Sequence, residues 1–156
     1  MQARIRLSVS DLNDIGGRVL VIFDGHCGLC NGSVRWFLVR DRKDRLRFVP
    51  SESPKVAEIL RRHGMNMVAD PAGPDTILVV RDPGGPTERL LERSDGVMAM
   101  LEELPRPWPA VAAVLRWIPR GLRDLVYRLI ARWRYRIWGR LESCPLLTAE
   151  ERGRFL

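Results

Sequence analysis

The sequence predicts an α/β fold, in which a mixed sheet is flanked by helices and followed by a helical extension at the C-terminal side. Val19–Phe23 is a continuous run of apolar, mostly β-branched residues, which is typical of a strand covered on both faces. Two cysteines, Cys27 and Cys30, follow this run where a helical pattern begins. Beyond Pro105 the composition shifts to proline, tryptophan and arginine.

The length of the chain favours one well-buried core over two. The 156 residues include 46% hydrophobic residues, enough for a single domain with its own interior. We therefore predict an α/β domain over residues 1–104 and a helical extension over residues 105–156 that packs on the same domain.

The elements of the α/β domain follow from local patterns. Apolar positions at helical spacing predict a helix over residues 31–42 after the cysteine turn. Leu46–Pro50 alternates apolar and polar positions before a proline, which predicts a strand. Ser53 as N-cap, followed by proline, begins a helix that runs to about residue 63. These segments form a strand, helix, strand, helix unit.

A hairpin and a further helix complete the predicted domain. Residues 76–80 and 87–91 flank the turn-forming segment 82–86, which favours an antiparallel hairpin. Ser94 is the expected N-cap of a helix that reaches Glu103 and ends before Pro105.

The extension is predicted to be helical and amphipathic. Pro107, Pro109 and Pro119 divide it into short helices, and four of the five tryptophans lie in it. One stripe of apolar residues recurs every three or four positions, as on a helix that docks on a sheet. We call these residues the apolar stripe: Leu122, Leu125, Val126, Leu129, Ile130, Trp133 and Ile137.

The net charge of +7 is concentrated in the extension. Residues 116–140 contain eight arginines against one acidic residue, Asp124, which accounts for the whole excess. A solvated basic face explains this pattern, and anionic lipid or an acidic partner is the alternative. No base-reading or RNA-stacking motif accompanies the arginines, which argues against nucleic acid as a partner.

A second function class therefore stays open beside enzyme chemistry. Residues 121–138 can form a basic, tryptophan-rich helix at an anionic membrane surface or a partner protein, with cysteines that only stabilise or sense. The expected anchors lie off the apolar stripe: Tyr127, Arg128, Arg134 and Trp138.

The sequence predicts a cytoplasmic protein. No apolar run approaches the roughly 20 residues that span a bilayer, and residues 1–10 contain no apolar core of a signal peptide. Three cysteines are too few for a disulfide framework. Cys144 is expected to be a small buried residue, with a third redox thiol as the alternative.

The two spaced cysteines predict thiol-disulfide exchange. A C-x-x-C pair can close and reopen a small disulfide ring through a mixed disulfide. At a helix N-terminus, unpaired N–H groups and the helix dipole favour the thiolate. Cys27 is the expected nucleophile, and Cys30, one turn further in and less exposed, is the expected resolving cysteine. Inert thiols or half of a zinc site are the alternatives.

Three neighbours of the pair have candidate roles. His26 can stabilise the thiolate when protonated, or it can be an ordinary surface residue. Asp24 can transfer a proton if it is buried, or it can hold the backbone of the turn. Leu29 can contact a substrate, although a packing contact explains it equally well.

The motif residues resemble those of a known family. The segment from Phe23 to Val34, which reads FDGHCGLCNGSV, and the later RDR, FVP and RSD segments are similar to the DCC family of predicted thiol-disulfide oxidoreductases, also called DUF393. The family takes its name from Asp, Cys and Cys, here Asp24, Cys27 and Cys30. The resemblance covers most of the chain from Val19 onward.

The resemblance implies a thioredoxin-like fold and a dithiol enzyme without a cofactor or bound metal. Its substrate would be a protein disulfide or a glutathione-type thiol. By analogy with the turn at which glutaredoxins hold the glutathione carboxylate, Thr76, Ser94 and Asp95 would line a substrate groove. The insert between the cysteines, Gly28-Leu29, differs from those of thioredoxin and glutaredoxin, so their redox potentials do not transfer.

Overall fold

The computed structural model describes residues 15–65, 77–142 and 152–155. The strands and helices alternate along the first part of the chain, and the second part is helical. In chain order they are β1 (Val19–Phe23), α2 (Gly28–Arg40), β2 (Leu46–Pro50), α3 (Pro54–Arg62), β3 (Leu78–Arg81), β4 (Arg89–Glu92), α4 (Arg93–Glu103), α5 (Trp108–Leu115) and α6 (Arg120–Trp138).

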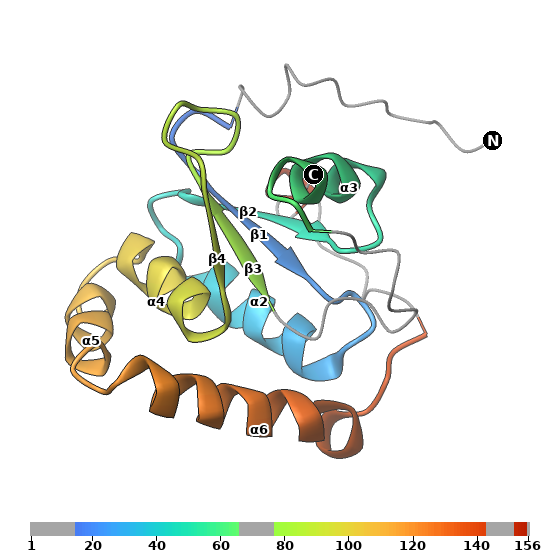
Figure 1. Ribbon diagram of the computed structural model, residues 1–156, viewed down its shortest axis with the longest axis vertical. Coiled ribbons are helices and arrows are strands. Elements are labelled where there is room, and N and C mark those ends of the chain that lie inside the picture. Colours follow the sequence, from blue (N-terminus) through green and yellow to red (C-terminus); the bar gives the residue numbers. More distant parts are fainter. Residues whose placement is uncertain (1–14, 66–76, 143–151, 156) are drawn as a thin grey trace.

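The four strands form one mixed sheet in the order β2-β1-β3-β4. β1 pairs in parallel with β2, whereas β3 is antiparallel to both β1 and β4. The parallel pair requires a crossover, which α2 supplies, and β3 and β4 form the predicted hairpin (Figure 1). This arrangement is thioredoxin-like and confirms the predicted fold class.

β1 is the central strand because both of its faces are covered. Val19, Val21 and Phe23 pack in the cluster with α2 and α4, whereas Leu20 and Ile22 pack in the cluster with α3. All five residues are at most 3% exposed. Side chains of a strand alternate between faces, so a strand that is apolar at every position needs a layer on each side.

Most predicted boundaries agree with the structure, and Ser94 is the exception. β1 and β2 have the predicted bounds, and α2 begins earlier than predicted, at Gly28. The prediction that Ser94 caps α4 is wrong, because the N-cap is Glu92, two residues earlier, and Ser94 lies in the first turn of the helix. The Ser94 hydroxyl instead donates a hydrogen bond to Asp124 of α6.

The extension packs against the α/β domain in two steps. α5 lies against α4, and α6 crosses both α2 and α4 on the side away from the sheet (Figure 1). The layers are therefore α3, the sheet, α2 with α4, and α6. No helix within the described residues has the length and apolar content needed to cross a bilayer.

The orientation of α6 corrects the expectation that its apolar stripe docks on the protein. All seven residues of the stripe are 44 to 63% exposed. The opposite face of α6, which carries Asp124, Tyr127, Arg134 and Tyr135, is the one that meets the domain. The helix is thus held by polar contacts on its inner face, and its apolar stripe stays about half exposed.

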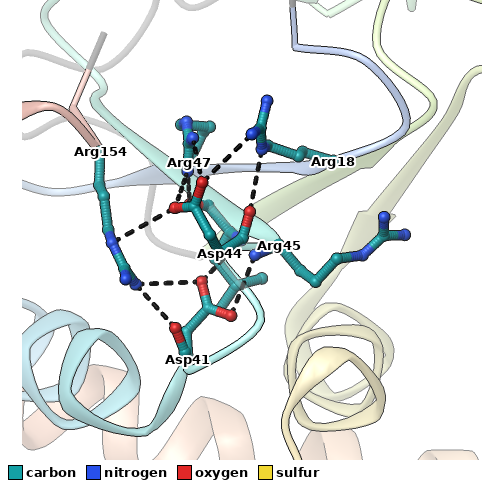
Figure 2. A network of polar contacts seen from close by, with 7 residues as sticks. Arg18, Asp41, Asp44, Arg45, Arg47 and Arg154 are labelled. Atoms are coloured by element: carbon teal, nitrogen blue, oxygen red, sulfur yellow. Dashed lines mark hydrogen bonds and ion pairs between the residues drawn. The ribbon is translucent and has the colours of Figure 1, made fainter.

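A polar network surrounds the loop between α2 and β2, at the end of the sheet where β2 begins (Figure 2). The carboxylate of Asp41, fully buried, accepts hydrogen bonds from the backbone N–H groups of Arg45 and Leu46, at 3.0 and 2.9 Å. Arg154 donates to the Asp41 carbonyl at 2.9 Å and pairs with its carboxylate at 3.3 Å. The guanidinium of Arg47 donates a hydrogen bond to the carboxylate of Asp44, with N and O 2.8 Å apart. This bond is the main cause that lowers the pKa of Asp44 to about 2. The network joins the end of α2 to the start of β2.

We expect Asp41→Ala to destabilise the fold by about 3 kcal/mol, because two backbone N–H groups and Arg154 lose a fully buried acceptor. Chemical denaturation followed by circular dichroism measures this loss. Asp44→Ala is the matched control. Its side chain is 43% exposed, so we expect a smaller loss of about 1 kcal/mol. Equal losses would contradict a special role for the buried carboxylate.

Candidate active site

The cysteine pair lies where β1 turns into α2, as predicted. Cys27 is the N-cap of α2 and has extended backbone angles. Its Sγ accepts a hydrogen bond from the backbone N–H of Cys30, with N and Sγ 3.3 Å apart. Both cysteines are free thiols. The sulfur of Cys27 thus occupies the position of a capping group, facing the positive end of the helix.

Hydrogen bonding polarises the pair. The Cys30 thiol donates toward Cys27, and this bond is the main cause that lowers the pKa of Cys27 to about 6. The Cys30 backbone N–H and the charge of Arg134 act in the same direction, against burial. The same thiol-thiol bond, together with burial, raises the pKa of Cys30. At neutral pH, Cys27 is therefore the thiolate and Cys30 holds the proton.

Asp24 has the turn-holding role, which is one of the two roles that the sequence left open. The carboxylate is buried, and its Oδ1 accepts a hydrogen bond from the backbone N–H of His26 at 2.8 Å, which fixes the turn. Its Oδ2 accepts the hydroxyl of Tyr135 and lies 3.5 Å from the Arg134 guanidinium. Burial and the bond to Asp24 raise the pKa of Tyr135 to about 12, so Tyr135 is a neutral donor.

Arg134 and Tyr135 are site residues that the sequence analysis missed. Both come from α6, which crosses the start of α2 (Figure 1). Arg134 is only 3% exposed, and Tyr127 accepts the backbone N–H of Ile77 at 2.8 Å. The prediction that Arg134 and Tyr127 are surface anchors is therefore wrong. Their position off the apolar stripe was the available signal, but it fits an inner polar face as well as an outer one.

Cys27 is covered by the segment that follows α6. Arg140 forms an isolated β-bridge with Cys27, and the Leu141 N–H donates to the His26 carbonyl at 2.8 Å. Cys27 is 0% exposed, whereas Cys30 is partly exposed. The expectation that Cys30 is the less exposed thiol is therefore wrong. An attack by Cys27 on a substrate requires residues 139–141 to move.

An apolar cavity of about 670 Å³ adjoins the pair. It lies between α2, α4 and α6, and both Leu29 and Cys30 contribute to its wall. Apolar side chains make up most of the remaining lining: Phe37, Ile77, Val97, Met98, Met100, Leu115, Ile118, Leu122, Val126 and Ile130. Cys30 is therefore the cysteine of the pair that this cavity reaches.

The structure brings some of the predicted substrate-binding residues together and separates others. Leu29 and Ser94 both line the cavity. His26 lies outside it, with its Nε2 3.1 Å from a Glu52 carboxylate oxygen. Asp95 pairs with Arg120 and Arg123 of α6, at 3.0 and 3.2 Å. Thr76 and Cys144 lie outside the described residues.

The fold and the site define the class of the protein as a thioredoxin-like protein with a C-x-x-C thiol pair at the start of its first crossover helix. The comparisons with known proteins agree. The model of the DCC1-like thiol-disulfide oxidoreductase family matches residues 21–140. The chain belongs to this family.

Two relatives have comparable similarity. A chloroplastic DCC family protein of Arabidopsis thaliana is 32% identical over 129 residues, which cover 83% of this chain and 70% of that protein. The uncharacterised protein YuxK of Bacillus subtilis is 29% identical over 143 residues, which cover 91% of this chain and 96% of that protein. No solved structure matches the chain significantly.

We expect the rate of Cys27 alkylation to rise with pH through a midpoint near 6 and then to level off, because only the thiolate reacts and its pKa is lowered. Arg134→Met removes a stabilising charge and should raise the midpoint by on the order of one pH unit. The measurement is iodoacetamide labelling followed by mass spectrometry. Arg134→Lys and the exposed Arg128→Met serve as controls, and both should keep the wild-type midpoint.

We expect Gly28→Ala to accelerate Cys27 alkylation at least severalfold at a fixed pH above the midpoint. A Cβ at Gly28 would lie 2.5 Å from the carbonyl oxygen of Trp138, so the covering segment has to shift. Gly32→Ala is the matched control, because a Cβ there meets nothing within 4 Å. An unchanged rate in Gly28→Ala would show that the segment does not limit access to Cys27.

Proposed function

We propose that the protein is a thiol-disulfide oxidoreductase that uses Cys27 and Cys30 for dithiol-disulfide exchange. The observation that carries this proposal is the capping position of Cys27, whose sulfur accepts hydrogen bonds from Cys30 and has its pKa lowered to about 6. A thiolate at neutral pH next to a protonated thiol is the state that begins disulfide exchange. Membership of the family supports the same activity.

The proposed reaction has two balanced steps. The Cys27 thiolate attacks one sulfur of the substrate disulfide, a new S–S bond forms, and the other substrate sulfur leaves as a thiolate that takes up a proton. Cys30 then loses its proton and attacks Cys27, which releases the second substrate thiol. The pair gives the substrate two electrons and closes to a disulfide. Of the two protons that the substrate thiols take up, one balances the proton lost by Cys30 and the other comes from solvent.

Asp24 is the proposed proton acceptor for the second step. It is buried close enough for its charge to raise the pKa of Cys30, and a negative group favours protonation of its neighbours until a reaction removes the proton. Once Cys27 is bound in the mixed disulfide, Cys30 loses its hydrogen bond to the thiolate. Asp24 then receives the proton of Cys30, directly or through a water molecule.

A protein disulfide is the favoured substrate class over a glutathione-type thiol. The wall of the cavity next to Cys30 is mainly apolar, which suits apolar side chains beside a peptide disulfide better than the charged ends of glutathione. The turn that would hold a glutathione carboxylate by analogy is engaged by α6, through Asp124 at Ser94 and through Arg120 at Asp95. Cellular thiols in the cytoplasm would return the pair to the dithiol state.

We expect the pair to show a reversible two-electron transition in glutathione redox buffers. The pKa of Cys27 lies between those of thioredoxin, about 7, and of a strongly oxidising periplasmic dithiol protein, about 3.5. A stabilised thiolate favours the reduced state, so the potential should lie between roughly −270 and −120 mV. Alkylating the free thiols at each buffer ratio and measuring the fraction of reduced protein by mass spectrometry gives this potential.

Variants of the pair and of Asp24 separate the steps. Cys27→Ser should abolish exchange with a disulfide-linked peptide, whereas Cys30→Ser should accumulate the mixed disulfide. Asp24→Asn should form the mixed disulfide at a similar rate and resolve it more slowly. Exchange that survives in Cys27→Ser, or a pair that shows no transition, would contradict the proposed function.

A further inference from the structure

The outer face of α6 is a continuous apolar surface at the edge of the active site. Its apolar stripe extends over more than four turns, about 24 Å at 1.5 Å per residue. The stripe residues are 44 to 63% exposed, and Trp117, shortly before α6, is 90% exposed. Soluble monomers rarely leave so many large apolar side chains in one patch, and such patches mark binding surfaces.

An arginine row borders this stripe along one side. Arg128, Arg132 and Arg136 follow each other at intervals of four residues, which places them in line on the helix. All three are exposed, and none forms an ion pair within the described part of the chain. The guanidinium of Arg136 lies over the ring of Trp133, 5.3 Å from its centre. The row therefore offers free positive charge beside apolar and aromatic groups.

The acidic residue of α6 does not reduce this charge. Asp124 is the one acidic residue between Arg120 and Trp138. It faces the domain, where it accepts the hydroxyl of Ser94 and lies 3.6 Å from Arg120. The outer face of α6 is consequently apolar and basic without an acidic member.

We propose that α6 docks on the surface of an anionic lipid bilayer, with the apolar stripe in the interface and the arginine row at the lipid headgroups. A helix with one apolar face, a basic flank and tryptophan lies in the plane of a membrane in this way. Charge complementarity selects the occupant, because a second copy would bring the same arginines and no acidic group on that face. This inference goes beyond the thiol chemistry and does not depend on it.

Docking would place the mouth of the cavity at the bilayer. Leu122, Val126 and Ile130 belong both to the apolar stripe and to the cavity wall that Cys30 shares. The redox site and the docking surface are therefore continuous. A protein disulfide at the membrane surface would therefore lie next to the thiol pair when α6 is docked on the bilayer.

The test is co-sedimentation of the full chain with vesicles of phosphatidylcholine alone or with phosphatidylglycerol. We expect binding that needs the anionic lipid and weakens as salt rises. Replacing Arg128, Arg132 and Arg136 together by Gln should lower the partition coefficient roughly a hundredfold, about fivefold per arginine. Leu125→Gln with Leu129→Gln should also abolish most binding, because both side chains are about half exposed in the free protein.

Matched controls remove the same charge or apolar surface elsewhere. Gln in place of Arg42, Lys43 and Arg61 removes three exposed cations outside α6, and Val39→Gln removes an apolar side chain that is 75% exposed on α2. Both should bind like the wild type. The double variant Cys27→Ser, Cys30→Ser should also bind, which separates docking from redox activity.

Four results would overturn the proposal. The first is a protein that stays in the supernatant with anionic vesicles, and the second is an equal loss of binding in the control variants. The third is a lipid-free dimer in sedimentation velocity that Leu125→Gln with Leu129→Gln dissociates, since this would assign the face to a second copy. The fourth is binding that is equal with and without phosphatidylglycerol, since this would exclude the role of the arginine row.

Discussion

The buried contact of Asp24 with Arg134 and Tyr135 joins two parts of the chain that are far apart in sequence, and the arrangement of the active site depends on it. Asp24 fixes the turn that carries Cys27, and the other two residues belong to α6. Through this contact the turn, the thiol pair and the covering segment after α6 keep fixed positions relative to one another. The cavity beside Cys30 exists because α6 is held at this end and, through Asp124, at the other.

A buried ion pair contributes little net stability, because the cost of removing two charges from water is similar to their attraction. Asp24 and Arg134 are both almost fully buried. Their ion pair therefore contributes to the site mainly by fixing the position of α6 and by placing a charge there. A well-packed apolar pair would hold α6 at least as firmly, but it would supply no positive charge for the Cys27 thiolate and no carboxylate to accept the N–H of His26 in the turn. The site thus combines two functions in one contact.

The sheet could be predicted well from the sequence, because each strand is defined by residues within or next to it. β-Branched runs, proline and glycine define β1, β2 and the hairpin, and a C-x-x-C pair after a buried strand is visible without a structure. The outcome for α6 differs, because periodicity identifies which residues share a face but not which way the face points. An apolar stripe normally packs inward. Here Arg134 and Tyr135 bury polar groups instead, and their partner Asp24 lies more than a hundred residues earlier.

The position of Ser94 shows the same limit on a smaller scale. A serine before an apolar run predicts an N-cap, yet its hydroxyl donates to Asp124 from a helix that lies much later in the chain. The order of exposure of the two cysteines is also the reverse of the predicted one. Cys27 is the more buried thiol, because residues 139–141 cover it. In each case a contact distant in sequence overrides a local preference.

The charge of Arg134 has a consequence for the energetics of the whole helix. Arg134 favours the thiolate of Cys27, and this charge disappears when the cysteines form a disulfide. The interaction between α6 and the turn is therefore stronger in the reduced protein than in the oxidised one. Thermodynamic linkage is reciprocal. An interaction that holds α6 in place therefore also favours reduction of the pair, and oxidation weakens the contact of α6 with the turn by the same free energy.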